Sequence, residues 1–177
     1  MLFPYRSPLD AAKALKFLIE DKVVCDLGCG DGDMLQAFVD NGAKDAVGIE
    51  RSLELVHRTR AKGFDCVYGN MLDEPLPIAD IYYIWVEAQR VFDTFVNIWN
   101  KTQKAVFVIA DYDIRSQDVE RLGGVVITVP YLEDETRQIK GTTFEKEGTW
   151  NMTIITKGYE NDYEEKFQDS DNDSDRD

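Results

Sequence analysis

VVCDLGCGDG, the stretch at residues 23–32, indicates the fold more directly than any other part of the chain. Its first five residues are mostly apolar, which is typical of a short parallel strand buried on both faces. Three of the next five are glycines, which let a ligand approach the backbone closely. In an open α/β sheet, nucleotides bind in the crevice beyond the carboxyl end of such a strand. The stretch therefore predicts a strand, a ligand-binding turn and a following helix.

Strand and helix patterns alternate outward from this stretch. A helix is expected before it, ending near residue 21, and another after it with Leu35, Phe38 and Val39 facing inward. Further strands are predicted at residues 46–49, 65–68, 81–85 and 105–109, and helices at residues 53–62 and 91–99. This alternation is typical of an α/β fold with a doubly wound, mostly parallel sheet and helices on both faces.

The pattern changes after two glycines at positions 123 and 124. Segments 125–129 and 150–156 are rich in β-branched residues with no convincing helical pattern between them, so they predict an antiparallel C-terminal strand pair. This pair would close one edge of a seven-strand sheet. The polar segment 133–148 between them predicts an extra hairpin or a loop.

Acidic residues are concentrated at the end of the chain. The 177 residues carry a formal net charge of −14, and residues 160–177, with nine Asp/Glu and two Lys/Arg, account for half of it. So acidic a segment with few apolar residues cannot bury a core. We therefore expect one domain at residues 1–159 and a disordered acidic tail at residues 160–177.

The remaining composition excludes several classes of protein. Three cysteines give no disulfide framework, and one histidine with no Cys-x-x-Cys gives no zinc-ligand spacing. No metal is therefore expected, and free thiols favour a reducing compartment. No long apolar run opens the chain, so we expect neither a signal peptide nor a membrane span and place the protein in the cytoplasm.

The glycine turn does not have the spacing of a dinucleotide site. That fingerprint requires G-x-G-x-x-G, whereas the glycines here follow G-x-G-x-G and Asp33 occupies the position of the last glycine. An acid at Asp31, facing the start of a helix, would also repel a pyrophosphate. A ligand with a cationic amine fits this turn better.

Asp26 followed by Gly28, Gly30 and Gly32 resembles the first motif of class I S-adenosylmethionine-dependent methyltransferases, which have a seven-strand Rossmann-like fold. The resemblance spans residues 5–156 and implies S-adenosylmethionine as the cofactor. By this resemblance Asp26 would hold the methionine amino group, directly or through water. The three glycines, with Cys29 between them, would admit the methionine and ribose parts.

Two further landmarks of the family fall at the expected strand ends. Glu50 matches the acid that takes the ribose hydroxyls, and Arg51 follows it at the same site. Asn70 stands where the family more often has Asp, and its amide oxygen would accept the adenine amino group. Met71 would cover the adenine face, and Trp85 or its neighbour Val86 would line the mouth through which the methyl group is transferred. Taken singly, each polar residue could instead be a helix cap, a solvated acid or a turn residue.

The methyl acceptor is less well indicated than the cofactor. Glu87 is the candidate group for holding or deprotonating an amine. Its alternative role is structural, because the helix dipole favours an acid in the first turn of a helix. The Asn/Asp-Pro-Pro-Tyr/Phe stretch of methyltransferases that act on bases or glutamine is replaced by IWVEAQ at residues 84–89. An acidic chain would also be repelled by phosphate backbones, so we do not expect nucleic acid as the substrate.

A second, looser resemblance concerns the acceptor. Residues 4–8 before a helix, the first motif and the segment after the fourth strand resemble the small seven-strand protein-lysine methyltransferases. They imply a basic protein or another amine as the methyl acceptor. A small-molecule methyltransferase and a non-catalytic S-adenosylmethionine-binding interaction protein are the alternatives. The sequence gives no indication of oligomeric state.

Overall fold

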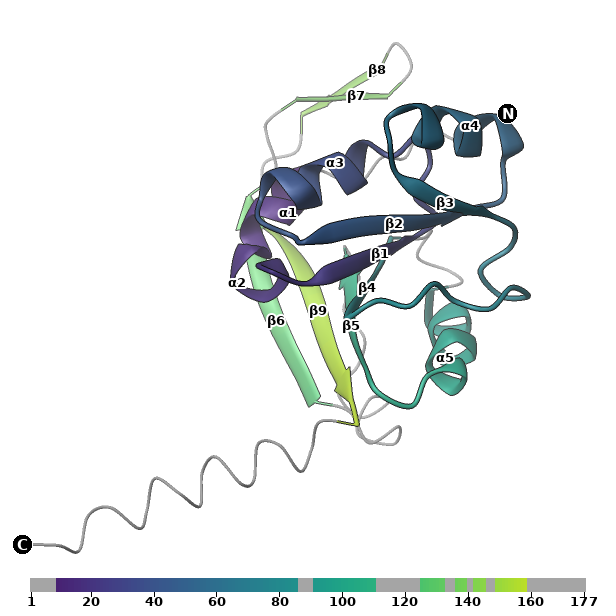
Figure 1. Ribbon diagram of the computed structural model, residues 1–177. Helices are drawn as coiled ribbons and strands as arrows, with labels where there is room; N and C mark the ends of the chain where they lie inside the picture. Colours follow the sequence, from purple (N-terminus) through teal and green to yellow (C-terminus); the bar gives the residue numbers. More distant parts are fainter. Residues whose placement is uncertain are drawn as a thin grey trace, which may run out of the picture.

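The computed structural model describes residues 9–85, 91–110, 125–132, 136–139, 142–145 and 149–158. Within these ranges the chain forms a seven-stranded sheet and a separate two-stranded sheet (Figure 1). The order of the large sheet is β3-β2-β1-β4-β5-β9-β6. Its strands are β1 (Val23–Leu27), β2 (Asp45–Glu50), β3 (Asp65–Tyr68), β4 (Ile81–Ile84), β5 (Ala105–Ala110), β6 (Val125–Leu132) and β9 (Thr149–Lys157).

The pairing of these strands confirms the predicted fold class. The neighbours from β3 to β5 all pair in parallel, whereas β9 pairs antiparallel with both β5 and β6. Strand β1 lies between β2 and β4. The chain runs from β1 through β2 to β3 at one edge of the sheet, and then crosses back to form β4 on the other side of β1. Ligands of open α/β sheets bind at the carboxyl ends of the strands at such a switch point. The fold thus places the turn after β1 where a ligand is expected.

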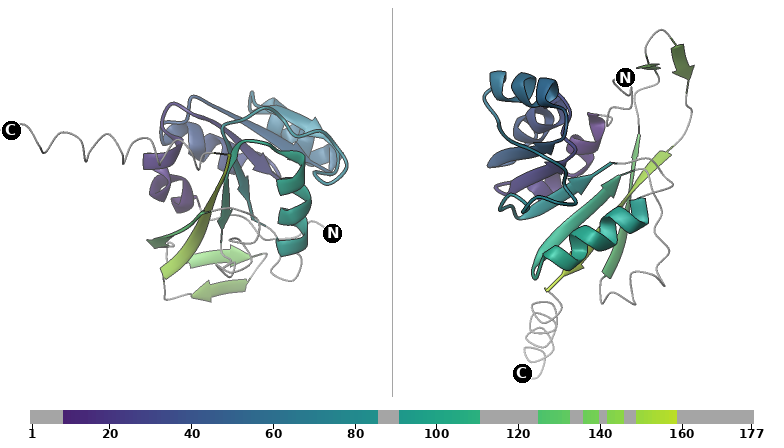
Figure 2. Two further views of the ribbon diagram at one scale, coloured as in Figure 1. Left: turned by 90° about the horizontal axis from the view of Figure 1, so that it is seen from below. Right: turned by 90° about the vertical axis from the view of Figure 1, so that its right-hand side faces the viewer.

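Helices cover both faces of the sheet, as the alternation of patterns predicts. They are α1 (Asp10–Ala14), α2 (Lys16–Ile19), α3 (Asp33–Asp40), α4 (Leu53–Ala61) and α5 (Val91–Lys101). Buried hydrophobic side chains of the first four helices belong to one core cluster, and those of α5 belong to a second cluster. Figure 2 shows α5 lying along β4 and β5, away from the other helices. No helix within the described ranges is long and apolar enough to cross a membrane.

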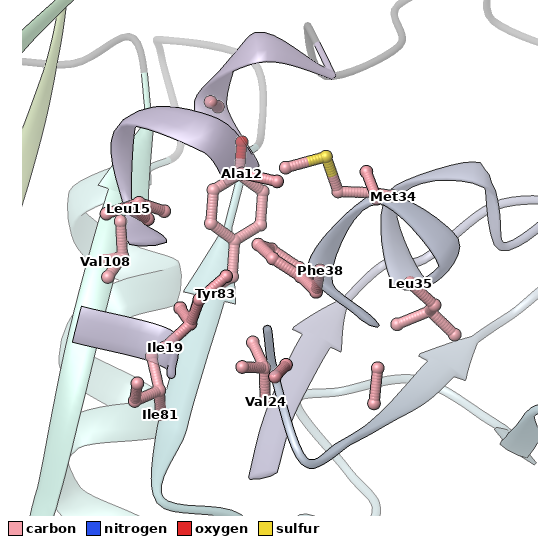
Figure 3. Packing of buried hydrophobic residues seen from close by; sticks show 14 of the residues in the cluster. Ala12, Leu15, Ile19, Val24, Met34, Leu35, Phe38, Ile81, Tyr83 and Val108 are labelled. Atoms are coloured by element: carbon pink, nitrogen blue, oxygen red, sulfur yellow. The ribbon is translucent and has the colours of Figure 1, made fainter. Parts of the chain in front are cut away.

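The first core cluster fixes α1, α2 and α3 against the centre of the sheet (Figure 3). Phe38 of α3 meets Tyr83 of β4 edge to face, with ring centroids 5.2 Å apart. Leu15 and Ile19 come from the N-terminal helices and are fully buried. Full burial of one such side chain contributes about 1.5–3 kcal/mol to stability. Met34 and Leu35 in the first turn of α3 are buried in the same cluster, so the start of α3, which directly follows the glycine turn, is held on the sheet.

Two details of the helices differ from the sequence prediction. The helix expected to end near residue 21 is divided into α1 and α2, because Leu15 takes φ −88° and ψ 2° between them. Val39, predicted to face inward, is 37% exposed. Adjacent helical residues point about 100° apart, so burial of Phe38 turns Val39 toward the edge of the packed face.

The segment at residues 133–148 contains the hairpin that was one of its two predicted structures. Strands β7 (Thr136–Ile139) and β8 (Thr142–Glu145) pair antiparallel as a two-stranded sheet of their own. The predicted acidic tail at residues 160–177 lies outside the described residues, and so does Glu87.

Candidate functional site

The predicted glycine turn joins β1 to α3 at the switch point. Gly28, Gly30 and Gly32 have φ of 90°, 58° and 84°, a region that side chains other than glycine rarely adopt. The backbone amides of Gly28 and Cys29 both donate to the carbonyl oxygen of Ile49, at 2.9 and 3.2 Å. Gly32 then serves as the N-cap of α3. These bonds tie the turn to the end of β2, where the second predicted site residue lies.

Glu50, the last residue of β2, links the glycine turn to the loop after its own strand. One carboxylate oxygen, Oε2, accepts a hydrogen bond from the amide of Gly30 at 3.0 Å, and Oε1 accepts one from the amide of Ser52 at 2.8 Å. A carboxylate has about four acceptor positions, so both oxygens can accept another donor. The half-buried carboxylate is therefore held in place with the capacity to bind two hydroxyl groups.

Asp26 lies on β1, two residues before the first glycine, and is only 5% exposed. Its carboxyl group has no hydrogen-bond donor within the described ranges, although buried carboxyl groups are normally paired. Burial, with a smaller contribution from the negative charge of Glu50, raises the pKa of Asp26 to about 7. A buried acid with no donor is suited to a cationic ligand. The amino group of S-adenosylmethionine is such a cation, so the buried carboxyl group of Asp26 fits this cofactor.

Asn70 and Met71 form the start of a turn after β3. The amide oxygen of Asn70 accepts a hydrogen bond from the backbone of Leu72 at 3.0 Å, so the residue does act as a turn former. That oxygen retains a second acceptor position. The turn also lies close to the first glycine, because a Cβ atom placed on Gly28 would be 3.4 Å from the terminal methyl group of Met71. The two predicted adenine-side residues and the glycine turn are thus brought together.

The other predicted residues are placed less directly. The Sγ atom of Cys29 lies 3.6 Å from that of Cys66 and both residues are buried, so only the backbone of Cys29 is suited to contact a ligand. Arg51 is exposed beside Glu50. Trp85 follows β4 and packs, half-buried, against the first core cluster. Glu87 lies outside the described residues, so its predicted role is not tested by the structure.

Sequence reasoning missed two residues that support the glycine turn, Thr59 in α4 and Lys62 directly after this helix. The hydroxyl of buried Thr59 donates to the carbonyl oxygen of Gly30 at 2.9 Å. Lys62 forms an ion pair with Asp33 at 2.5 Å and lies 4.0 Å from Asp31. The helical spacing of Thr59 after apolar Val56 was the available signal, since it puts a hydroxyl on the buried face.

We expect Gly48→Ala to lower the free energy of unfolding by about 1–3 kcal/mol, the usual cost of overpacking a core. A Cβ atom at Gly48 on β2 would lie 2.3 Å from the Sγ atom of Cys29 and 2.7 Å from its Cβ atom. Urea denaturation of the wild type and the variant measures the change. Adding Cys29→Ala removes the nearer clash, with the sulfur, but keeps the Cβ contact at 2.7 Å, so the double variant should recover only part of the loss. Equal stability of Gly48→Ala and the wild type would contradict the described contact.

A comparison with protein families adds to this geometry. Residues 5–117 match a family model described as a methyltransferase domain. The chain belongs to this methyltransferase family. It is an S-adenosylmethionine-dependent enzyme of class I, as the resemblance of its first motif implied, and S-adenosylmethionine is its cofactor. No curated protein matches the chain in sequence.

Solved methyltransferase structures share the fold over most of this methyltransferase's length. A putative RNA methyltransferase from Pyrococcus horikoshii is 21% identical with a TM-score of 0.64, and the match covers 86% of this chain and 87% of that one. Magnesium protoporphyrin IX methyltransferase from Synechocystis is 11% identical with a TM-score of 0.57, covering 84% and 79%. An RNA methyltransferase from Salinibacter ruber is 17% identical with a TM-score of 0.56, covering 86% and 93%. At these identities the likeness concerns the fold.

Proposed function

We propose that this methyltransferase transfers a methyl group to an amine on a basic protein, with the lysine side chain as the acceptor. The observation that carries the proposal is the charge of the chain, −14 over 177 residues with a sequence pI of about 4.5. A strongly negative protein attracts cationic partners and repels polyanions. Nucleic acids bind proteins largely through phosphates and basic side chains, which disfavours RNA here in spite of the two RNA methyltransferases with the same fold.

The proposed cofactor site follows the edge of the sheet from β1 to β4. Asp26 pairs with the amino group of the cofactor, and Glu50 accepts the ribose hydroxyls while keeping its bond to Gly30. Asn70 and Met71 provide the adenine side. The backbone of the glycine turn admits the ligand, and Arg51 and Trp85 are proposed to border it.

Bound S-adenosylmethionine supplies an electrophilic methyl group, so the protein mainly has to hold the acceptor in line with it. A lysine side chain is protonated at neutral pH and must lose a proton before it can attack. Glu87, two positions after Trp85 in the sequence, is the proposed group that binds the ammonium and takes this proton. The acidic tail at residues 160–177 is proposed to remain separate from the domain at residues 1–159.

The acceptor proposal predicts that the full chain transfers labelled methyl groups to a lysine-rich basic peptide. The matched samples contain the same peptide with its lysines trimethylated beforehand, which keeps their charge and leaves no lone pair, an unstructured RNA of equal mass, and a mixture of small primary amines. We expect label only in the unmodified peptide. Label in RNA, or in small amines alone, would contradict the proposed acceptor and would leave the proposed cofactor site unaffected.

Glu87→Gln tests the proposed proton acceptor in the same assay. We expect kcat to fall about 10²–10⁴-fold, the usual contribution of a general base, with the cofactor Kd unchanged. Glu54→Gln is the matched control, because Glu54 is an exposed acid on α4 paired with Arg58. An unchanged kcat in Glu87→Gln would remove the residue from the mechanism.

A further inference from the structure

Lys101, the last residue of α5, contacts the turn after β3 from across the second core cluster. Its ammonium group donates to the carbonyl oxygens of Met71 and Glu74, both at 3.1 Å, and to that of Leu72. A lysine ammonium has three donors and no acceptor, so these three carbonyls match its full capacity. One side chain therefore gathers the carbonyl groups of a turn that is about 30 residues away in sequence.

The turn also has hydrogen bonds of its own and one apolar side chain packed on the core. Within it, the backbone amides of Asp73 and Glu74 both donate to the carbonyl oxygen of Asn70 at 3.0 Å. The side chain of Met71 packs, half-buried, against the core cluster that contains Phe95 and Trp99 of α5. Helix α5 thus holds the turn through the ammonium group of Lys101, and Met71 adds apolar contact with the second core cluster.

We propose that Lys101 is a positioning residue that sets the adenine end of the cofactor site. The proposal rests on the site proposed above, in which Asn70 meets the adenine amino group and Met71 covers its face. If Lys101 is removed, three carbonyl groups lose a charged donor and the turn can move relative to the glycine turn. Lys101 is itself exposed, so water replaces its bonds and the free energy of unfolding changes little. The expected effect of removing Lys101 is therefore a change in the positions of Asn70 and Met71, not in the free energy of unfolding.

Lys157 on β9 provides a matched control within the same region. Its ammonium group also donates to two backbone carbonyl oxygens, those of Trp99 at 2.7 Å and Thr102 at 2.6 Å. Both acceptors belong to the end of α5 or the residue following it, and neither belongs to the turn after β3. Removal of Lys157 therefore weakens the end of the helix without releasing the turn.

The experiment compares Lys101→Met, Lys101→Arg and Lys157→Met with the wild type by calorimetric titration. The ligands are S-adenosylhomocysteine and its inosine analogue, in which the adenine amino group is replaced by a carbonyl oxygen. We expect Lys101→Met to raise the Kd of S-adenosylhomocysteine roughly fivefold, about the effect of losing one neutral hydrogen bond, that between Asn70 and the adenine amino group. The preference for the adenosine form over the inosine form should also shrink. Lys101→Arg should recover part of both effects, and Lys157→Met should change Kd by less than about twofold.

Hydrogen exchange of the cofactor-free proteins gives a second readout. In Lys101→Met we expect faster exchange of the Leu72, Asp73 and Glu74 amides, with strand amides unchanged. If Lys101→Met keeps the wild-type Kd and base preference, the positioning role is wrong while the cofactor site stands. If the folded wild type itself fails to bind S-adenosylhomocysteine, the proposed site is wrong, and the role of Lys101 with it.

Discussion

Asp26→Asn is expected to weaken S-adenosylmethionine binding while making the cofactor-free protein more stable. Among the residues that the structure describes, none donates a hydrogen bond to this buried carboxyl group, so in the proposed complex the amino group of the cofactor is its charged partner. Truncating one member of a buried charge pair costs about 2–5 kcal/mol of binding free energy, which is roughly 30-fold to several thousandfold in Kd. Asparagine keeps the shape of the side chain and removes only its charge.

The stability change has the opposite sign because of the pKa of the same group. Burial raises the pKa of Asp26 from 3.8 to about 7, so the folded state binds a proton more tightly than the unfolded state. The contribution of Asp26 to stability therefore falls as the pH rises from 3.8 to about 7 and stays low above that range. At pH 8 the neutral amide should raise the free energy of unfolding by about 1–3 kcal/mol, after allowance for its own unpaired polar atoms.

Urea denaturation at pH 8 and calorimetric titration measure the two effects on one preparation. Asp80→Asn is the control, because exposed Asp80 accepts a hydrogen bond from the amide of Val23 at the opposite end of β1. This control should lose a little stability and keep its cofactor affinity. If Asp26→Asn binds like the wild type, Asp26 is not a ligand of the cofactor. If the variant is less stable at pH 8, burial of the ionised carboxyl group does not lower the stability of the free protein.

The second large effect is the pH dependence of cofactor affinity. A cationic amine pairs with the ionised form of Asp26, whose pKa is about 7 in the free protein. Below that pH a proton must leave before the cofactor binds, so Kd should rise about tenfold per pH unit and roughly a hundredfold by pH 5. Above about pH 8 this group adds no further change. S-adenosylhomocysteine carries the same amino group and is the ligand to titrate between pH 5 and pH 8.

Proton release gives a direct check on the origin of this pH dependence. At pH 6, titrations in buffers of different ionisation enthalpy should show close to one proton released per bound ligand. Asp26→Asn removes the titrating group, so its weaker affinity should be flat over the same range. A slope that persists in this variant would assign the pH dependence to another group.

The parallel part of the sheet was predictable from sequence because its strands are short and largely apolar, and β1 and β3 are each followed directly by a glycine. Strands β1 and β3 begin and end where the patterns predict, and β5 extends one residue further. The break at Leu15 was not predictable, because the residue remains fully buried and keeps the helical apolar pattern. The spacing of apolar residues predicts which side chains are buried. It does not predict a change of backbone direction between two short helices, because that change depends on what the helices pack against.

The candidate site shows the same limit. The acid and glycines after β1, with Glu50 and Asn70, follow strand ends and can be located by counting along the chain. The supporting contacts made by Thr59 and Lys101 join segments 27–30 residues apart. Nothing in the neighbouring sequence distinguishes Lys101 from a solvated lysine at a helix end, since its partners are backbone carbonyls that any residue type would present.

The position of β9 has a consequence for the order in which the molecule is completed. This strand is the last of the sheet in sequence, yet it lies between β5 and β6 and pairs with both along most of its length. During synthesis, β5 and β6 leave the ribosome without a neighbour in common, and each exposes unpaired backbone groups that invite association with other chains. The sheet closes only when residues 149–157 become available. This nine-residue strand therefore determines when the facing edges of β5 and β6 become paired.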